Sequence, residues 1–353
     1  MPEMSNRLAV DGGRPLRTAP MPGWPRFDQD DTRAVSHVLR SGRVNYWTGT
    51  EAVEFEHEFA AAHGIGHAIA FMNGTVTLEA ALAALGVGPG CEVIVPARTF
   101  IATASAVVTR GAVPVIVDVD PASGNITAAT IERAITARTR AVIVVHLAGW
   151  PSDMDAILRV TDAAGVPVIE DCAQALGATF RGRPAGTMGT FGSFSFCQDK
   201  IITTGGEGGM LVTARRDLWE RAWSLKDHGK SYAKTREAEP GDGVAFRWVH
   251  DSFGTNWRMT EMQAALGRRG MTHLPAWLER RRRSARILDG ALADIPAIRT
   301  AVPAEGTAHA YYKYYAYLRP ERLREGWSRD RVASAVVAEG VPCFTGTCPE
   351  IYR

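Results

Sequence analysis

Lys200 is the first residue in this sequence whose surroundings suggest covalent chemistry. It follows Phe194-Ser195-Phe196 after a short interval and precedes the glycine-rich turn Gly205-Gly206-Glu207-Gly208-Gly209. An amine held among small and aromatic residues can be free to attack an aldehyde. A lysine of this kind can equally be structural or exposed, so this motif alone leaves its role open.

An acidic pair at the end of a predicted strand is the second candidate. Glu170-Asp171 closes the apolar run at residues 166–171, and Gln174 follows three residues later. Burying a carboxylate is costly unless the charge is paired. The protonated ring nitrogen of an electron-withdrawing cofactor would be a suitable partner. Asp171 could instead cap the helix that follows it.

Two polar turns could bind an anion or a neighbouring chain. Asn73-Gly74-Thr75 follows one predicted strand and opens a helix, where free N–H groups and the helix dipole favour negative charge. Ser195 could bind the same phosphate. The second turn, Gly254-Thr255-Asn256-Trp257-Arg258-Met259, suits contact with a ligand or a second subunit. Either turn could also be an ordinary helix start.

Short apolar runs alternate with alanine-rich helical stretches and would position these residues. The runs lie at residues 67–72, 92–96, 113–118, 141–146 and 166–171, with helical spacing at 75–85 and 154–164. This alternation predicts buried parallel strands with helices on both faces. Such sheets carry their chemistry at the carboxyl ends of the strands, where Asp118, His146 and the 170–171 pair fall. Two further strands are predicted at 191–196 and 209–213.

The chain outside this sheet is predicted to form an arm and a smaller domain. We expect an N-terminal arm at residues 1–25, a large domain at 26–258 and a small C-terminal domain at 259–353 that is incomplete. The small domain should hold a helix from Thr260 towards Pro275, a second helix at 277–288, a strand at 311–318 and a helix at 329–339. Residues 230–243 are predicted to form a loop near the substrate.

Composition and charge exclude several classes of protein. The chain has 353 residues, a formal net charge of +2, and hydrophobic and charged fractions of 46% and 22%, as in an ordinary soluble protein. So small a charge predicts no nucleic-acid partner, and the arginines at 280–283 are interpreted as a solvated helix face. The five scattered cysteines predict no metal site and fit a cytoplasmic enzyme. No signal peptide and no apolar run of ~20 residues is found, so no membrane contact is expected.

In this order the motifs resemble the DegT/DnrJ/EryC1/StrS family of aminotransferases that depend on pyridoxal 5'-phosphate (PLP). The resemblance starts near Gly12 and also includes Tyr46-Trp47-Thr48-Gly49 and Val93-Ile94-Val95-Pro96-Ala97-Arg98-Thr99-Phe100. It implies the α/β fold of aspartate aminotransferase (type I PLP fold). That fold has a large, mostly parallel sheet with helices on both faces, and a smaller C-terminal α+β domain.

The resemblance also implies roles for individual residues. Lys200 would hold PLP as a Schiff base and later move the proton between substrate carbon and cofactor, and Asp171 would pair with the pyridinium nitrogen. The other implied cofactor contacts are Phe100 on the ring, Gln174 near the 3-hydroxyl, Gly74, Thr75 and Ser195 on the phosphate, and Asn256 on the phosphate from a partner subunit. A shared site of this kind implies a homodimer.

The implied reaction is a ping-pong transamination from an amino acid, by family habit L-glutamate, to a keto sugar that is expected to be nucleotide-linked. The sequence that follows the lysine, Ile201-Ile202-Thr203-Thr204, also resembles branches of the family that aminate cyclitols. A cyclitol or another cyclic ketone is therefore an alternative acceptor. A PLP-binding protein without turnover is a further alternative, because relatives usually continue beyond Arg353. Sugar dehydratases of this fold carry histidine at the position of Lys200, which argues against that activity.

Overall fold

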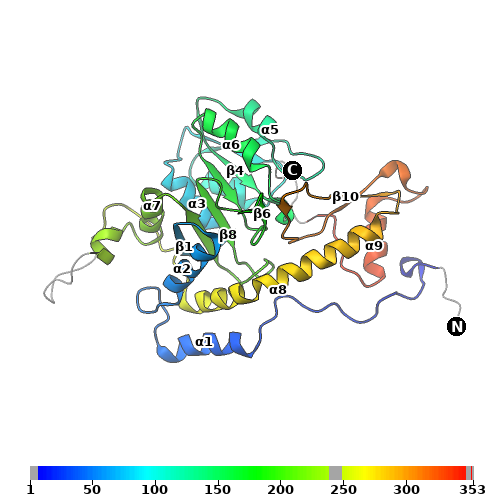
Figure 1. The fold of residues 1–353 in the computed structure, drawn as a ribbon, viewed down its shortest axis with the longest axis horizontal. Helices are drawn as coiled ribbons and strands as arrows, with labels where there is room; N and C mark the ends of the chain where they lie inside the picture. The colour runs from blue at the N-terminus through cyan, green and yellow to red at the C-terminus, as the bar shows by residue number, and fades with distance from the viewer. Residues whose placement is uncertain (1–6, 238–248, 347–350, 352–353) are drawn as a thin grey trace.

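A seven-stranded sheet forms the centre of the computed structural model, which describes residues 7–237, 249–346 and 351 (Figure 1). The strand order is β1-β9-β8-β5-β4-β2-β3. Neighbours among β2, β3, β4, β5 and β8 pair in parallel, whereas β9 is antiparallel to both β8 and β1. The strands are β1 (His67–Phe71), β2 (Glu92–Pro96), β3 (Val113–Val117), β4 (Thr139–Val145), β5 (Val168–Asp171), β8 (Phe191–Ser195) and β9 (Gly209–Thr213). The predicted strands and the type I PLP fold are confirmed.

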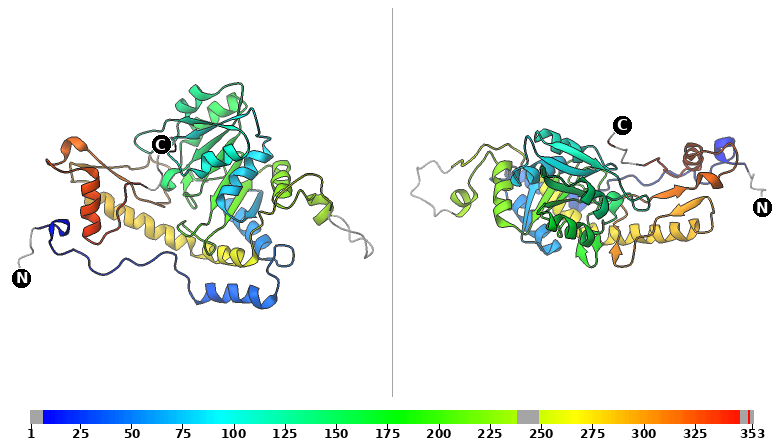
Figure 2. Two further views of the ribbon diagram at one scale, coloured as in Figure 1. Left: turned by 180° about the vertical axis from the view of Figure 1, so that it is seen from behind. Right: turned by 90° about the horizontal axis from the view of Figure 1, so that it is seen from above.

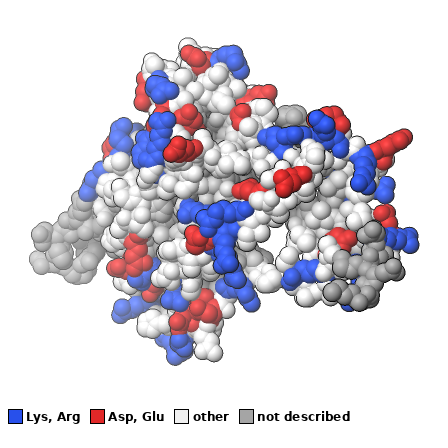
Figure 3. All heavy atoms as spheres, turned by 45° about the vertical axis from the view of Figure 1, so that its right-hand side comes forward, with Lys and Arg blue, Asp and Glu red and all other residues white. Residues whose placement is uncertain are grey.

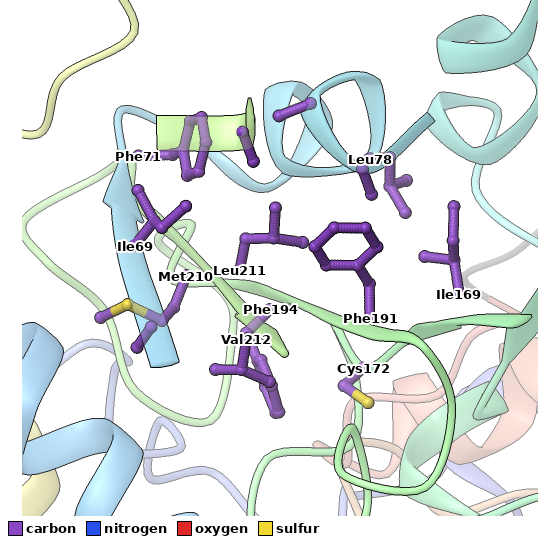
Figure 4. Close-up of a cluster of buried hydrophobic side chains, with 14 of the residues drawn as sticks. Ile69, Phe71, Leu78, Ile169, Cys172, Phe191, Phe194, Met210, Leu211 and Val212 are labelled. Atoms are coloured by element: carbon purple, nitrogen blue, oxygen red, sulfur yellow. The ribbon is translucent and has the colours of Figure 1, made fainter. Parts of the chain in front are cut away.

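The central strands of the sheet are buried on both faces because they are mostly apolar, whereas the edge strand β3 is partly exposed. Val93 and Val95 belong to one hydrophobic cluster, whereas Ile94 between them belongs to another, as the two-residue period of a strand requires. Figure 4 shows Leu211 pointing towards Leu78 while its neighbours point to the opposite face. The covering helices are α2 (Glu51–His63), α3 (Gly74–Ala84), α4 (Ala102–Thr109), α5 (Ala128–Ala134), α6 (Met154–Ala163) and α7 (Arg216–Lys226).

One long helix, α8 (Glu261–Leu292), leads away from the sheet (Figure 1). The prediction of two helices separated near Pro275 was wrong, because Pro275 lies inside this helix. A proline in a helix interior costs about 3 kcal/mol. Leu274 precedes Pro275 and Leu278 follows it, and both side chains are buried. Burial of apolar residues on the two sides of the proline therefore offsets its energetic cost. Its contacts reach from α1 (Gln29–Ser41) and α2 to β10 (Ile298–Thr300).

Beyond α8 the chain forms a small, mostly irregular region. β10 pairs with β12 (Ala316–Leu318), and α9 (Arg329–Ala338) follows. Only the end of the predicted strand at 311–318 is a strand, because Tyr311 has a positive φ of 48° and donates its N–H to His309 Nδ1 at 2.7 Å. The remaining elements are β6 (Thr179–Phe180), β7 (Arg183–Pro184), β11 (Thr307–Ala308), η1 (Ala9–Asp11), η2 (Leu147–Gly149), the π-helical η3 (Ala233–Glu237) and η4 (Pro320–Arg322). The predicted loop at 230–243 lies outside the described residues from 238 onwards.

The N-terminal segment runs as an extended arm and ends against α9 (Figure 2). The Glu339 carboxylate accepts the N–H groups of Ala9 and Leu16 at 2.8 and 2.9 Å, and the Arg17 N–H bonds the Glu339 carbonyl at 3.1 Å. On the face drawn in Figure 3, basic and acidic side chains are interspersed. Within the described part of the chain, no helix combines the length and the apolar character needed to cross a bilayer.

Candidate active site

Asp171 ends β5 at the carboxyl edge of the sheet, where a ligand was expected. Its carboxylate is buried and accepts hydrogen bonds from the Thr103 hydroxyl at 3.0 Å and the Ala173 N–H at 3.1 Å. Burial raises the pKa of Asp171, and these two hydrogen bonds oppose that rise. The folded chain therefore holds an acid whose charge is poorly compensated until a cationic partner arrives.

Glu170, one residue earlier, points to the other face and has a structural environment. Its fully buried carboxylate accepts three backbone N–H groups, from Gly186, Met188 and Gly189, and lies 2.9 Å from His146 Nε2. Burial alone would raise the pKa of Glu170, but these hydrogen bonds and His146 outweigh it and the pKa is lowered. The His146 Nδ1 accepts the Ser152 N–H at 3.1 Å, which places the ring proton on Nε2. His146 is thus a packed, hydrogen-bonded histidine.

Lys200 lies in the turn between β8 and β9, and its side chain is 18% exposed. Its amine is 3.2 Å from Asp199 Oδ1 and 3.3 Å from the Tyr312 hydroxyl. Its carbonyl accepts the indole N–H of Trp24 at 3.1 Å. The turn closes on Gly206, whose φ of 131° a residue with a side chain rarely adopts.

Gly74 and Ser195 form a narrow cradle at the start of α3. A Cβ atom added at Gly74 would lie 2.6 Å from the Cβ of Ser195, so only glycine fits this approach. The Asn73 side chain caps the helix by accepting the Val76 N–H at 3.1 Å. The N–H groups of Gly74 and Thr75 belong to the first helical turn, which has no acceptor within the helix. This arrangement is suited to a phosphate.

Gln174 and Phe100 border the same edge. The Gln174 side-chain oxygen accepts the Ala148 N–H at 2.7 Å, which fixes the orientation of its amide. Phe100 is 58% exposed, and its carbonyl accepts the Thr103 N–H at 3.1 Å. The backbone of this exposed residue is therefore fixed to that of Thr103, whose hydroxyl supports Asp171.

Asn256 lies in an exposed loop beside the end of β1. The backbone of Asn256 bridges to Asp227, and the next residue, Trp257, accepts the Met72 N–H at 2.9 Å. The Asn256 side chain is exposed, and Phe253 in the same loop is fully exposed. The structure thus shows this loop directed outward, while the other predicted cofactor residues gather at the carboxyl edge.

Sequence reasoning missed four residues that touch this site: Trp24, Thr103, Asp199 and Tyr312. Thr103 carries a weak signal in the sequence, because it lies four residues after Thr99, which belongs to a motif that the resemblance includes. Tyr312 is separated from Lys200 by 112 residues, so no local pattern connects them. Asp199 adjoins the lysine, but an acidic neighbour is also common on surfaces.

A type I PLP fold with a lysine and a buried acid at its carboxyl edge defines a class of PLP enzymes. The chain belongs to the DegT/DnrJ/EryC1/StrS aminotransferase family, whose model matches residues 25–345. It is a PLP-dependent aminotransferase, as the resemblance implied. It is 39% identical to an L-glutamine:2-deoxy-scyllo-inosose aminotransferase of Streptomyces kanamyceticus over 99% of this chain and 82% of that protein.

Solved structures agree with this assignment. An aminotransferase from Psychrobacter cryohalolentis is 49% identical, with a TM-score of 0.92 over 94% of this chain and 86% of that one. DesI, solved in the presence of its TDP-sugar product, is 31% identical, with a TM-score of 0.82 over 95% and 81% of the two chains. The fold and the class of reaction are thereby shown.

Proposed function

We propose that Lys200 holds PLP covalently, that Asp171 pairs with its ring nitrogen, and that the chain transfers an amino group to a polyhydroxylated cyclic ketone. The observation that carries this proposal is the meeting of an accessible amine, a buried acid and a phosphate cradle at one edge of the sheet. When bound, PLP supplies an electron sink for the bonding electrons of the substrate carbon. All other contributions come from the side chains of this chain.

The site residues divide these contributions among them. Asp171, held by Thr103 and the Ala173 N–H, keeps the ring nitrogen protonated. Lys200 accepts the proton of the substrate carbon and would pass it to the cofactor. The cradle fits a phosphate because a Cβ at Gly74 would fill it. The proposed ligand contacts are Gly74, Thr75 and Ser195 on the phosphate, Gln174 near the 3-hydroxyl and Phe100 on the ring.

For the acceptor we propose a free cyclitol ketone, with L-glutamine or L-glutamate as the donor. Eight curated relatives, 38–39% identical, are named for amination of inososes by L-glutamine. The turn after Lys200 also resembles cyclitol branches of the family. A nucleotide-linked keto sugar is the second candidate, which the likeness to DesI favours. The donor L-glutamate and a cytoplasmic location stay predictions.

We further propose a homodimer in which Asn256 reaches the phosphate bound by the partner subunit. Its loop carries the fully exposed Phe253, and Phe100, Ile101 and Met72 are also exposed at 58, 49 and 40%. Apolar side chains in such positions are typical of a covered interface. A closed twofold interface would place each Asn256 loop against the other subunit.

An amination screen tests the catalytic proposal. Purified protein would be loaded with PLP and given 2-deoxy-scyllo-inosose, scyllo-inosose or a TDP-keto sugar, each with glutamine or glutamate. We expect amination of the inososes and loss of all turnover in Lys200→Ala. Arg286→Ala, an exposed arginine paired with Glu279, is the control that should keep activity. PLP uptake without turnover on any pair would instead favour a binding protein.

A mixing experiment tests the shared site. Lys200→Ala and Asn256→Ala would be refolded together in equal amounts. Half of the dimers would be mixed, and each mixed dimer would have one intact site, so roughly a quarter of wild-type activity should return. Activity no higher than the sum of the two separate variants would refute the contribution of Asn256 from the partner.

A further inference from the structure

The amine of Lys200 already has two hydrogen-bonding partners beside it. Asp199 Oδ1 lies 3.2 Å from Nζ and the Tyr312 hydroxyl 3.3 Å from it. The same hydroxyl makes a short contact with the second oxygen of Asp199. A phenol has one proton to donate, and the carboxylate accepts it. The phenol oxygen therefore accepts from the amine.

Tyr312 is held rigidly, although it comes from a distant part of the chain. It is buried, and Arg281 of α8 donates to the carbonyls of Tyr311 and Tyr312 at 3.1 and 3.4 Å. Arg281 in turn lies over the ring of Trp24, 5.8 Å from its centroid. The hydroxyl is thus aimed at Lys200 by contacts that do not involve the lysine itself.

We propose that Asp199 and Tyr312 form a holding couple, which fixes the position and orientation of the Lys200 amine when it is free and keeps the charge of Asp199 beside its nitrogen when it is bonded to the cofactor. This inference rests on the proposed role of Lys200. A neutral amine has two N–H bonds and one lone pair. With one N–H on Asp199 and the other on Tyr312, the lone pair points away from the couple, where it can accept a proton.

Asp199 also supplies a negative charge close to the lysine nitrogen. Burial would raise the pKa of Asp199, but the Tyr312 hydrogen bond and Lys200 outweigh it and lower this pKa, so the carboxylate is ionised. The other charged or titratable groups near this position are Asp171 from β5, Cys197 in the same turn, Lys313, whose amine lies 4.8 Å from the Tyr312 ring centroid, and Arg281 of α8, which interacts electrostatically with Tyr312. The ionised carboxylate of Asp199 thus lies 3.2 Å from the Lys200 nitrogen.

Two substitutions separate charge from position. Asp199→Asn removes the charge and keeps the shape, whereas Tyr312→Phe removes the hydroxyl and keeps the charge. The matched controls are Asp217→Asn, an aspartate of similar exposure at 51 against 54%, and Tyr314→Phe, which removes a tyrosine–aspartate hydrogen bond to Asp289. Neither control residue touches Lys200.

The first readout is the pH midpoint of the visible absorption band of the lysine-bound cofactor. A carboxylate near a cation shifts such a midpoint by about 1–3 units, and partial exposure places Asp199 at the lower end. We therefore expect Asp199→Asn to lower the midpoint by about one unit, and Tyr312→Phe and both controls to leave it near the wild-type value. An unchanged midpoint in Asp199→Asn would overturn the proposal.

The second readout is the rate at which apoprotein captures PLP. Loss of one hydrogen bond that orients the amine should slow capture in Tyr312→Phe by about tenfold, and kcat should fall with little change in the KM of the donor. Capture at the wild-type rate would refute the orienting role of Tyr312. Lys200→Ala distinguishes a failure of the proposed function from a failure of the holding couple. If this variant still forms the visible band, the proposed role of Lys200 is wrong. If it does not, the results for Asp199→Asn and Tyr312→Phe test the holding couple alone.

Discussion

Replacing Thr103 by valine should weaken the support of Asp171 with little change of shape. The Thr103 side chain is 1% exposed, and its hydroxyl lies 3.0 Å from Asp171 Oδ2 and 2.8 Å from the Thr99 hydroxyl. Because the proton of Thr103 is directed at the carboxylate, Thr99 must donate to Thr103. Valine removes both bonds and leaves Asp171 with the Ala173 N–H.

The magnitude follows from these two bonds. A hydrogen bond to a charged group contributes about 1.5–3 kcal/mol, and a neutral one about 1 kcal/mol. We expect Thr103→Val to destabilise the apoprotein by about 2–4 kcal/mol at neutral pH. For a chain of 353 residues, an unfolding entropy of about 2.1 cal/mol/K per residue converts this loss to about 3–5 °C in Tm.

The pH dependence identifies the carboxylate as the cause. Burial raises the pKa of Asp171 above the ordinary value of an aspartate, so the energetic cost of its charge is absent at pH values below that ordinary value and grows as the pH rises. The difference between variant and wild type should therefore shrink as pH falls from neutral towards the ordinary carboxyl range.

Thermal unfolding of apoprotein over a series of pH values measures both effects. Thr161→Val is the matched control, because Thr161 is equally buried but donates to backbone carbonyls of Ile157 and Leu158 at 3.2 and 3.3 Å. Its loss in Tm should be smaller and independent of pH. A loss in Tm that is independent of pH in Thr103→Val as well would refute the role assigned to Thr103. In the holoenzyme, we expect the same substitution to lower the rate of transamination by about tenfold.

Three further substitutions test the cradle and the buried charges. Gly74→Ala would place a Cβ 2.6 Å from the Cβ of Ser195, so PLP affinity should fall at least about tenfold by fluorescence titration, whereas Gly290→Ala, with open space around it, should bind normally. Glu170→Gln turns an amide towards backbone donors and should cost about 3–5 kcal/mol in denaturant unfolding. Lys226→Met leaves the buried carboxylate of Glu56, 3.5 Å away, without its cation and should lower the free energy of unfolding by a similar amount. Neutralising Glu56 in the same variant should restore most of that loss.

The central sheet was predictable because its signals are local. The apolar runs that became β2 and β9 needed no distant partner to be recognised. Asp171 lies at the end of one such run, and Lys200 lies in the turn that follows another. The boundary at Pro275 failed because a local rule, that proline ends a helix, was outweighed by burial on both sides of it. The strand predicted from Tyr311 failed because a single side-chain hydrogen bond to His309 redirects the backbone.

The residues that support the reactive lysine could not be found in the same way. Trp24 donates to the Lys200 carbonyl, and Tyr312 lies beside its amine, yet neither belongs to a motif of the large domain. Both meet Arg281 on α8, which lies over one ring and bonds the backbone of the other. The position of the amine thus depends on the arm and on the chain beyond α8, so a change in either should alter the cofactor spectrum even when every motif residue is intact.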